Sequence, residues 1–519
     1  MSNGGINIKN QLQIIMVSAC VLVIVLLFAA QEKLHVDYLT DVSFSNFDGK
    51  IQLVWDVPLF SRVSEVKINI SSTTESFSER VSPLKKEYEF TDGEHGTLYN
   101  ISLHEIHKDG SIGKIYEENV MFLNYAQLPD LPTVYIYTET GEEPTNDIAE
   151  KPSEWLWGAS PINNEYVSGD MMFVRDGLET VSSKMELRIR GNTSTLGDKK
   201  SYKLRLDSSV DVLNLGEEHA DTEWILLNVG NRLNNYVGEY LSEVCGMEWV
   251  AHGMFVNVML NGDWKGMYYL SEAVNKEQAG DNVSETGFVF ENDAYWWKPD
   301  VAYFKVSTQV YQLGFTFKYP KLSNPNDTRL ESLKWYMEAV TGMLTSWDEE
   351  ALDYIDADTF AAWIMVRDIM HSGDAGGSNM YYYIYDLNGA DYAANKLKMG
   401  PVWDYDAGMQ GAENWHEDMT GWSANHDQTI TYFPYLFDMS AFRAVYKEKW
   451  ERVSEELNRN YDAYMEKLLL SQGLEINESR KLDSVRWGSK MMTIEEEIAY
   501  NSDFIRQRIE WINSAVEEW

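Results

Sequence analysis

Apolar and polar residues alternate through the N-terminal part of the chain, and this period constrains the fold more than any other feature. Between Val36 and Leu123, runs such as Val66, Ile68 and Ile70 place an apolar residue at every second position. Successive side chains of a β-strand point to opposite faces, so this period is typical of strands with one buried face. Because turn signals such as Asp109-Gly110 separate the runs, the segment predicts a small antiparallel sandwich.

The same segment resembles a fibronectin type III domain. The resemblance rests on Trp55 in an early strand and on the stretch Gly96-Thr-Leu-Tyr99 before a late one. It implies a module over residues 36–125 that acts as a spacer or a binding surface, and no cluster of catalytic residue types is evident within it.

A proline-marked linker from Leu128 to Pro132 ends the all-β region, and the pattern after it is mixed α and β. A chain of 519 residues is too long for one compact core, so two or three domains are expected. The sequence therefore predicts a multidomain protein with an all-β sandwich over residues 36–125 and an α+β domain over residues 131–519.

A long apolar run precedes the sandwich. Residues Leu12 to Ala30 carry no charge and are apolar except for Gln13 and Ser18, and a helix of about 20 such residues can cross a bilayer. Residues 1–33 are therefore predicted to be a transmembrane signal anchor or a cleaved signal peptide, and the length of the run favours the anchor. Lys9 favours a cytoplasmic N-terminus. The expected location is membrane-anchored and extracytoplasmic, at the cell surface, or secreted if the segment is cleaved.

The acidic balance of the chain restricts its partners. The formal net charge is −39, although charged residues make up an ordinary 24%. Binding to the phosphates of nucleic acid needs basic stripes, so no nucleic-acid partner is expected. A surplus of this size suits a protein that self-repulsion keeps soluble, or one surrounded by divalent cations. The two cysteines, Cys20 and Cys245, imply no disulfide framework.

A loop in the second region has the features of a phosphate-binding turn. Lys184 to Arg190 and Ser201 to Asp207 read as strands, and Gly191 to Gly197 joins them. The loop offers backbone N–H groups and hydroxyls, and lysines follow it, a combination that can cover and neutralise phosphates. The alternative is a plain hairpin loop with exposed lysines. The candidate nucleotide contacts of this segment are Arg190, Asn192, Ser194, Lys200 and Lys203.

A second hairpin is predicted around Asn261-Gly262. The runs Phe255–Leu260 and Gly266–Glu272 flank this dipeptide and alternate in polarity. Asn-Gly in such a setting is a strong signal for a two-residue turn between antiparallel strands.

Further along the chain, a helix, a polar loop and two strands are predicted in succession. The helix would be capped by Asp358 and would run to Met370. The loop HSGDAGGSN (His371–Asn379) follows, and strands are predicted within Met380–Tyr385 and Lys396–Asp406.

If these two strands pair antiparallel, Asn379 lies beside Asp404 or Asp406, and Asp374 approaches from the loop. Asp404 and Asp406 would share a face because side chains repeat every second residue in a strand. Amide and carboxylate oxygens are hard ligands that suit Mg²⁺. The alternative is a polar turn, since Asp, Gly, Ser and Asn are all common in turns.

Taken together, several stretches resemble the CotH family of atypical kinases, named for a spore-coat protein. They occur in the family's order from about Leu131 to the C-terminus. Asp374 and Asn379 also have the D-x-x-x-x-N spacing of a protein-kinase catalytic loop. The matching stretches are RGNTST (Arg190–Thr195), KKSYKLRL (Lys199–Leu206), WILLN (Trp224–Asn228), NGDWKGMYYLSEAV (Asn261–Val274), DAGGSN (Asp374–Asn379) and VWDYDAG (Val402–Gly408).

The resemblance implies an α+β atypical protein-kinase-like domain over residues 131–519, with ATP and Mg²⁺ as cofactors. It implies that Asp374 is the base that orients an acceptor hydroxyl. It further implies that Asn379 holds a metal ion together with Asp404, which is slightly favoured, or with Asp406.

The resemblance also implies that Lys200 or Lys203 contacts phosphate and that Glu272 lies at a hinge to the nucleotide base. There are departures from ordinary kinases. His371 lies three residues before Asp374 rather than two, and the loop from Gly191 is not G-x-G-x-x-G. These departures exclude an ordinary protein kinase but not the atypical family.

The predicted function is an extracytoplasmic, Mg²⁺-dependent protein kinase that phosphorylates Ser/Thr hydroxyls of a bacterial surface or coat protein. The alternative is a catalytically inactive kinase-like surface protein that binds a cell-wall polymer or a protein partner. The expected partners are a protein substrate and, through the N-terminal helix, a membrane. The sequence does not indicate an oligomeric state.

Overall fold

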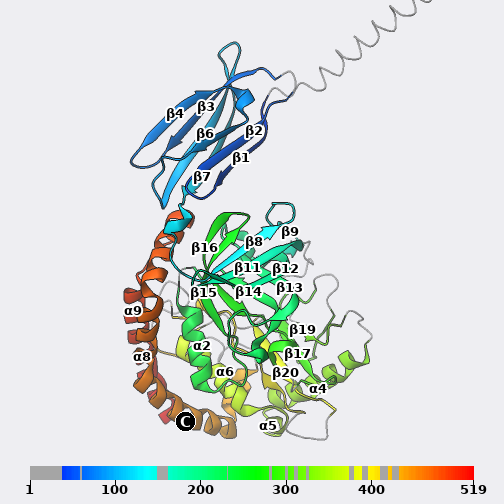
Figure 1. Cartoon of the computed structure of the whole chain (residues 1–519). Coiled ribbons are helices and arrows are strands. Elements are labelled where there is room, and N and C mark those ends of the chain that lie inside the picture. Colours follow the sequence, from blue (N-terminus) through cyan, green and yellow to red (C-terminus); the bar gives the residue numbers. More distant parts are fainter. Residues whose placement is uncertain are drawn as a thin grey trace, which may run out of the picture. The chain divides into compact units, whose positions relative to one another are not determined.

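The computed structural model divides the chain into two compact units, Met1–Leu128 and Pro129–Trp519 (Figure 1). The residues that it describes are 38–58, 61–148, 162–230, 232–279, 283–297, 302–308, 314–322, 327–372, 379–388, 395–409, 419–423 and 432–519.

The first unit is a sandwich of two antiparallel sheets. One sheet has the order β1 (Thr40–Asn46), β2 (Ile51–Asp56) and β5 (Glu87–Phe90); the other has the order β4 (Ser76–Val81), β3 (Val63–Ser71), β6 (Thr97–His107) and β7 (Ile112–Phe122). The alternating residues Val66, Ile68 and Ile70 are all buried in one core between the sheets. The period-two pattern therefore predicted these strands and their inward faces correctly.

Tyr99 lies near the start of β6 and closes one corner of the sandwich. Its hydroxyl accepts a hydrogen bond from the backbone N–H of Glu94 at 3.0 Å, and its ring is fully buried. A tyrosine that bonds back to the preceding backbone in this way is a tyrosine corner, which is typical of immunoglobulin-like sandwiches. Trp55 is buried as well, and its indole N–H donates to the carbonyl of Pro83 at 2.8 Å.

The second unit begins with a closed barrel. Its strands follow the order β11 (Val167–Arg175), β12 (Leu178–Arg190), β13 (Ser201–Val210), β14 (Asp221–Leu227), β16 (Asp263–Glu272), β15 (Gly253–Leu260) and β8 (Thr133–Thr138). The predicted strands Lys184–Arg190 and Ser201–Asp207 lie within β12 and β13 and pair antiparallel. Alternate residues such as Leu187, Ile189 and Leu204 fill the barrel, so the residues between them face outward.

The predicted Asn-Gly hairpin is confirmed. Asn261 and Gly262 join β15 to β16 with φ angles of 52° and 81°. Positive φ at both central residues is typical of a type I′ turn, whose twist matches that of the flanking strands.

A second sheet and a set of helices complete this unit. The sheet has the order β18 (Tyr303–Phe304), β19 (Gly314–Tyr319), β17 (Phe288–Asp293), β20 (Met380–Ile384) and β21 (Lys398–Met399), and a short pair is formed by β9 (Asn146–Ile148) and β10 (Ile162–Asn164). The helices are α2 (Asn234–Cys245), α3 (Lys276–Ala279), α4 (Thr328–Thr345), α5 (Ala351–Tyr354), α6 (Ala357–Met370), α7 (Phe433–Asp438), α8 (Ser440–Trp487) and α9 (Ile494–Glu517).

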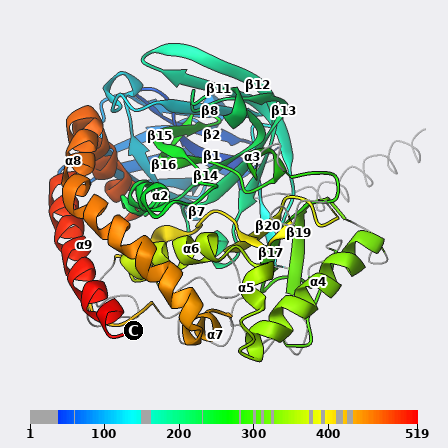
Figure 2. The same ribbon diagram turned by 90° about the horizontal axis from the view of Figure 1, so that it is seen from below.

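Helix α6 is the centre of the larger core. All of its residues from Thr359 to Met370 are buried, and it packs against α2, α8, α9 and β21. Figure 2 shows α8 and α9 side by side along one edge of this unit, with α2 and α6 next to them. Elements from distant parts of the sequence are therefore held together around one buried helix.

The predicted transmembrane helix is wrong, together with the membrane-anchored location and the membrane partner inferred from it. Among the residues that the structure describes, no helix combines the length and the apolar character needed to cross a bilayer. Even in the long helix α8, charges such as Lys447, Lys449 and Glu451 recur, and charged residues are costly in hydrocarbon. Residues 1–33, on which the prediction rested, lie outside the described residues.

Two local boundaries also differ from the prediction. Asp356, not Asp358, caps α6, because its carboxylate accepts the backbone N–H of Thr359 at 3.1 Å; Asp358 lies in the first turn. The returning strand β21 is only Lys398–Met399, far shorter than expected. Pro401 follows it closely and has no N–H to extend the ladder.

A buried ion pair ties α8 and α9 to the start of α2. Arg480 of α8 and Glu497 of α9 lie 2.6 Å apart with at most 2% of either side chain exposed. Glu497 also accepts the backbone N–H of Leu233, the residue that precedes α2, at 2.8 Å. Because the pair is buried, removal of the carboxylate would leave both a guanidinium and an N–H group unsatisfied.

We therefore expect Glu497→Ala to lower the free energy of unfolding of this unit by about 3–5 kcal/mol, measured by urea denaturation. Glu455→Ala is the matched control, because Glu455 pairs with Arg459 on the exposed face of α8. It should change stability by less than about 1 kcal/mol. Equal effects of the two substitutions would contradict the role of the buried pair.

Candidate functional site

A cavity of about 420 Å³ lies beside strands β12, β13 and β19 and is strongly basic. The apolar part of its wall includes Val274, Phe317, Tyr381 and Trp403. In a chain of net charge −39, such a concentration of positive charge favours an anionic ligand. The cationic residues of its wall are Arg188, Arg190, Lys203, Arg205, Lys318 and Lys321.

The alternation of β12 and β13 places these cations on one face. Leu187, Ile189 and Leu204 point into the barrel, so their neighbours Arg188 and Lys203 point out of it. Arg188 and Lys203 are also direct partners in the register of the two strands. A basic outer surface is thus a direct result of the period-two pattern.

Lys203 is held in this cavity by a buried carboxylate. Its ammonium lies 2.8 Å from Glu223 of the neighbouring strand β14. Burial lowers the pKa of Lys203 to about 8, although the Glu223 charge opposes this. Burial would raise the pKa of Glu223, but the charge and hydrogen bond of Lys203, together with the charges of Lys321 and Arg205, outweigh it and the pKa is lowered. The pair is therefore ionised at neutral pH, with a lysine that gives up its proton unusually easily.

The other candidate lysine, Lys200, lies elsewhere. Its ammonium donates to the carbonyl oxygens of Thr195 at 2.7 Å and Gly197 at 2.5 Å, and it lines a different cavity. Ser194 lines yet another cavity, and Asn192 precedes the short 3₁₀ helix Thr193–Leu196. The predicted nucleotide contacts are thus divided, and the structure places Arg190 and Lys203 together on the basic cavity.

Asn379 and Asp404 are brought into contact, and both lie close along the chain to residues that line the basic cavity. The amide nitrogen of Asn379 donates to Oδ2 of Asp404 at 2.9 Å. Both residues have left-handed backbones, with φ of 63° and 62°, and non-glycine residues in this region often occur at functional sites. The cavity is lined by Trp403, which precedes Asp404, and by Tyr381, and Arg190 stacks on the Trp403 ring at 5.1 Å.

A buried arginine fixes the backbone of Asp404. Arg367 of α6 is fully buried and donates to the carbonyl oxygens of Trp403 and Asp404 and, at 3.1 Å, to the hydroxyl of Ser372. Sequence analysis missed this role. An arginine among the apolar residues of a helix is the signal that could have revealed it, because a buried charge needs partners.

Helix α2 holds the turn that follows. Asn234 donates to the carbonyl oxygens of Tyr405 at 2.9 Å and Gly408 at 2.7 Å. The Tyr405 ring is buried, and its hydroxyl lies 3.1 Å from that of Ser242. Gly238 faces the ring so closely that a Cβ there would lie 2.2 Å from it. The turn is therefore fixed by α2 from one side and by α6 from the other.

The two candidate aspartates do not share a face. Tyr405–Ala407 forms a 3₁₀ turn, so the strand-based prediction for Asp404 and Asp406 is wrong. Asp406 lines a second cavity of about 770 Å³, together with Asp198 and Arg232. Because this second cavity is partly acidic, it is a poorer place for phosphates than the basic one.

Glu291 of β17 is a further residue that sequence analysis missed. Its carboxylate lies 2.7 Å from the Lys318 ammonium, and it accepts the backbone N–H of Asn379 at 3.4 Å. Burial raises the pKa of the neighbouring Asp293 to about 6, with a further contribution from the Glu291 charge. Acidic residues at the end of a strand that begins with Phe-Val-Phe were the available signal.

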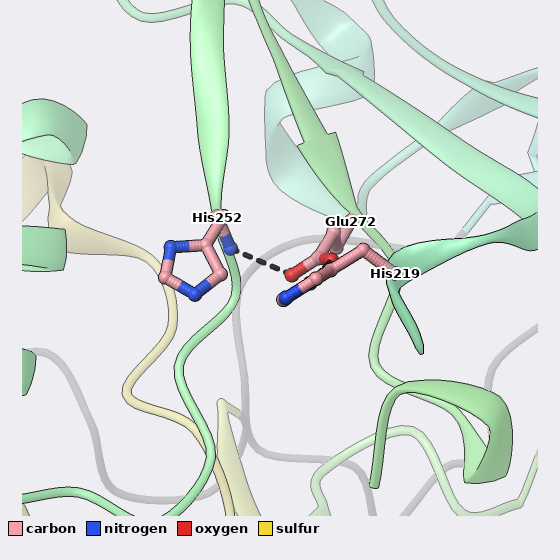
Figure 3. Close-up of side chains that lie close together, drawn as sticks. All are labelled: His219, His252 and Glu272. Carbon is pink, nitrogen blue, oxygen red and sulfur yellow. Dashed lines mark hydrogen bonds and ion pairs between the residues drawn. The ribbon is translucent and has the colours of Figure 1, made fainter. Parts of the chain in front are cut away.

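Glu272 does not point at the basic cavity. Among the described residues, the cavity wall includes the next three positions, Ala273 to Asn275, but not Glu272 itself. The Glu272 carboxylate lies 2.7 Å from Nδ1 of His219 and accepts the backbone N–H of His252 at 2.8 Å (Figure 3). Burial raises its pKa. Its predicted contact with a nucleotide base therefore has no geometric support.

The candidate base Asp374 belongs to residues 373–378, which lie outside the described residues. The segment is bounded by two placed residues. Ser372 is held by Arg367, and Asn379 contacts Asp404. The residues that flank the segment are thus linked to Asp404, Ser372 through Arg367 and Asn379 directly.

Comparison with known proteins identifies the class. The family described as "CotH kinase protein" matches residues 187–512, which include all the cationic residues of the basic cavity and the Asn379–Asp404 pair. The chain belongs to this family, and it is therefore a kinase-like protein. No curated protein matches the chain.

Among solved structures, the chain is similar to one described as the solution structure of the fn3 domain of human contactin 1. The identity is 14%, the match covers 16% of this chain and 76% of that chain, and the TM-score is 0.14.

We expect Gly238→Ala to destabilise the second unit, because the added methyl would collide with the buried ring of Tyr405. Gly342→Ala in α4 is the matched control, since nothing lies within 4 Å of its added Cβ. It should raise the free energy of unfolding by up to about 1 kcal/mol through helix propensity alone. In thermal denaturation, Gly238→Ala should lower the melting temperature and Gly342→Ala should raise it. A higher melting temperature for both variants would contradict the packing of Tyr405 on α2.

Proposed function

We propose that this protein is an ATP-dependent protein kinase that transfers the γ-phosphoryl group to Ser/Thr hydroxyls of a protein substrate. The observation that carries the proposal is the contact between Asn379 and Asp404, together with the strongly basic cavity lined by Trp403, the residue directly before Asp404. The family match supports a kinase-like protein, and kinases in general use ATP with a divalent cation.

The basic cavity is the proposed nucleotide site. Lys203 and Arg190 would contact the phosphates, because both line the cavity and project from the outer face of the barrel. The Lys203–Glu223 pair has the same chemistry as the lysine–glutamate pair that orders the phosphate-binding lysine in other kinases. Val274 and Phe317 offer an apolar wall for the base.

The donor set of Asn379 and Asp404 fits Mg²⁺. An amide oxygen and a carboxylate are hard ligands, and Mg²⁺ takes few protein ligands and completes its shell with water and phosphate oxygens. The bound ion would neutralise charge on the phosphates. The favoured aspartate is Asp404 rather than Asp406, because Asp406 faces the second cavity.

The proposed reaction needs no reactant other than ATP and the acceptor hydroxyl. The acceptor hydroxyl oxygen forms a bond to the γ-phosphorus, the bond from that phosphorus to the bridging oxygen of ADP breaks, and the hydroxyl proton passes to a carboxylate. Asp374 is proposed as this carboxylate from the family resemblance alone. Arg367 would act as a positioning residue, because it donates to the side-chain hydroxyl of Ser372 and to the backbone carbonyl of Asp404.

The proposal is tested by nucleotide-induced stabilisation. ATP with Mg²⁺ should raise the melting temperature of the wild type, since a ligand at about 100 times its Kd stabilises by about 2.7 kcal/mol. Lys203→Met and Asp404→Asn should lose most of the shift. Lys184→Met is the matched control, because Lys184 lies on the adjoining strand with its side chain 60% exposed and pairs with Asp170.

Transfer of radiolabel from γ-labelled ATP to a co-expressed protein then separates catalysis from binding. The wild type should label the protein and Asp374→Ala should not. Absence of any thermal shift at millimolar nucleotide would overturn the proposal in favour of a kinase-like binding protein. A thermal shift with nucleotide but no transfer of radiolabel would mean that the protein binds nucleotide without kinase activity.

The proposal also predicts a pH dependence. With a pKa of about 8, Lys203 is protonated below that pH and attracts phosphate, and it loses this charge above it. Nucleotide affinity should therefore fall as the pH rises through about 8. Lys203→Arg should show a flatter profile, because a guanidinium stays charged. Titration calorimetry from about pH 7 to about pH 9.5 measures both; identical profiles would exclude Lys203 from phosphate binding.

A further inference from the structure

A second group of ligand-type side chains lies apart from the Asn379–Asp404 pair. We call it the histidine–glutamate cluster and define it as His219, His252, Glu239, Glu243 and Glu272. Glu239 and Glu243 lie one turn apart on α2, and the other three come from the ends of barrel strands or the turns next to them. The fold thus brings one helix and three barrel segments to one place.

The donor atoms of the cluster are close enough to share a cation. Within the set His219, His252 and Glu272, and within the set Glu239, Glu243 and His252, all ligand atoms lie within 4.8 Å of one another. His252 belongs to both sets. Its Nδ1 lies 2.9 Å from Glu239 and 3.9 Å from Glu243. Figure 3 shows His219 and His252 on either side of the Glu272 carboxylate.

The cluster carries an excess of negative charge. In the described part of the chain, the ion pairs of Glu239, Glu243 and Glu272 involve only His219 and His252. Even with both imidazoles protonated, the three ionised carboxylates outnumber the positive charges by one. Glu272 is fully buried and Glu239 is largely so, so water compensates these charges poorly. A divalent cation would neutralise most of the excess.

We propose that the histidine–glutamate cluster binds a divalent transition-metal ion, with Zn²⁺ as the best fit. His219, His252 and Glu272 would be its ligands, and Glu239 or Glu243 would complete the shell. Mixed imidazole nitrogen and carboxylate oxygen ligands suit Zn²⁺ and its neighbours, whereas Mg²⁺ prefers oxygen alone. Binding would replace the imidazole–carboxylate hydrogen bonds with bonds to the metal ion.

The place of the cluster suggests what the ion would do. Glu272 immediately precedes Ala273 to Asn275, which line the basic cavity. α2, which carries Glu239 and Glu243, also fixes the turn after Asp404 through Asn234. An ion that joins Glu272 to α2 would therefore link the cavity wall to the support of Asp404, in a structural rather than a catalytic role.

The experiment measures metal binding directly and needs no nucleotide. The purified full chain is stripped with a chelator and titrated with Zn²⁺ in the presence of excess Mg²⁺. We expect saturation at one equivalent for this site. His219→Ala combined with His252→Ala should weaken binding by at least about tenfold, and Zn²⁺ should raise the melting temperature of the wild type but not of this double variant. His104→Ala, a histidine of the first unit, is the matched control.

A second measurement uses the wild type alone, so its result does not depend on whether the variants fold. Zn²⁺ should shield His219 and His252 from diethyl pyrocarbonate, read residue by residue by mass spectrometry, and should leave His104 reactive. Mg²⁺ should shield none of them. Absence of stoichiometric Zn²⁺ binding, or equal reactivity of His219 and His252 with and without Zn²⁺, would overturn the proposal whether or not the protein binds ATP.

Discussion

The guanidinium of Arg367 is the interaction on which the candidate site depends. It lies on a helix whose residues from Thr359 onward are all buried, and it binds the backbone at Trp403 and Asp404 and the side chain of Ser372. A charge at this depth needs hydrogen-bond acceptors, and both terminal nitrogens of the guanidinium find them. The acceptors belong to Ser372 and to the Trp403–Asp404 segment. The hydrogen bonds that compensate one buried cation therefore also fix the backbone around Asp404.

The basic cavity has a different origin. It results from the pleat of β12 and β13, where apolar residues fill the barrel and the alternate positions, occupied by arginine and lysine, face outward. The rigid barrel holds these cations at fixed positions, and the Lys203–Glu223 pair limits the movement of the lysine. The site therefore combines a preformed electrostatic surface with a turn that the helical core positions, a division of roles that suits the binding and alignment of a polyanion.

Much of this could be predicted from the sequence, because periodicity and turn chemistry are local. The strands of the sandwich, the Asn261-Gly262 hairpin and the proximity of Asn379 to Asp404 all followed from such rules. The separation of Asp404 from Asp406 could not, since it depends on how the Tyr405 ring packs on Gly238 of α2, a contact between distant segments. The orientation of Glu272 likewise depends on His219 and His252, which lie on other strands or turns.

The environment of Lys203 has a chemical consequence of its own. An amine with a pKa of about 8 is unprotonated in about a tenth of the molecules at neutral pH, roughly two-hundredfold more than an ordinary lysine. Only the free amine is a nucleophile, so at neutral pH this side chain is open to acylation by a reagent that enters the cavity. The barrel thus provides a natural attachment point for a covalent probe, located within the cavity itself.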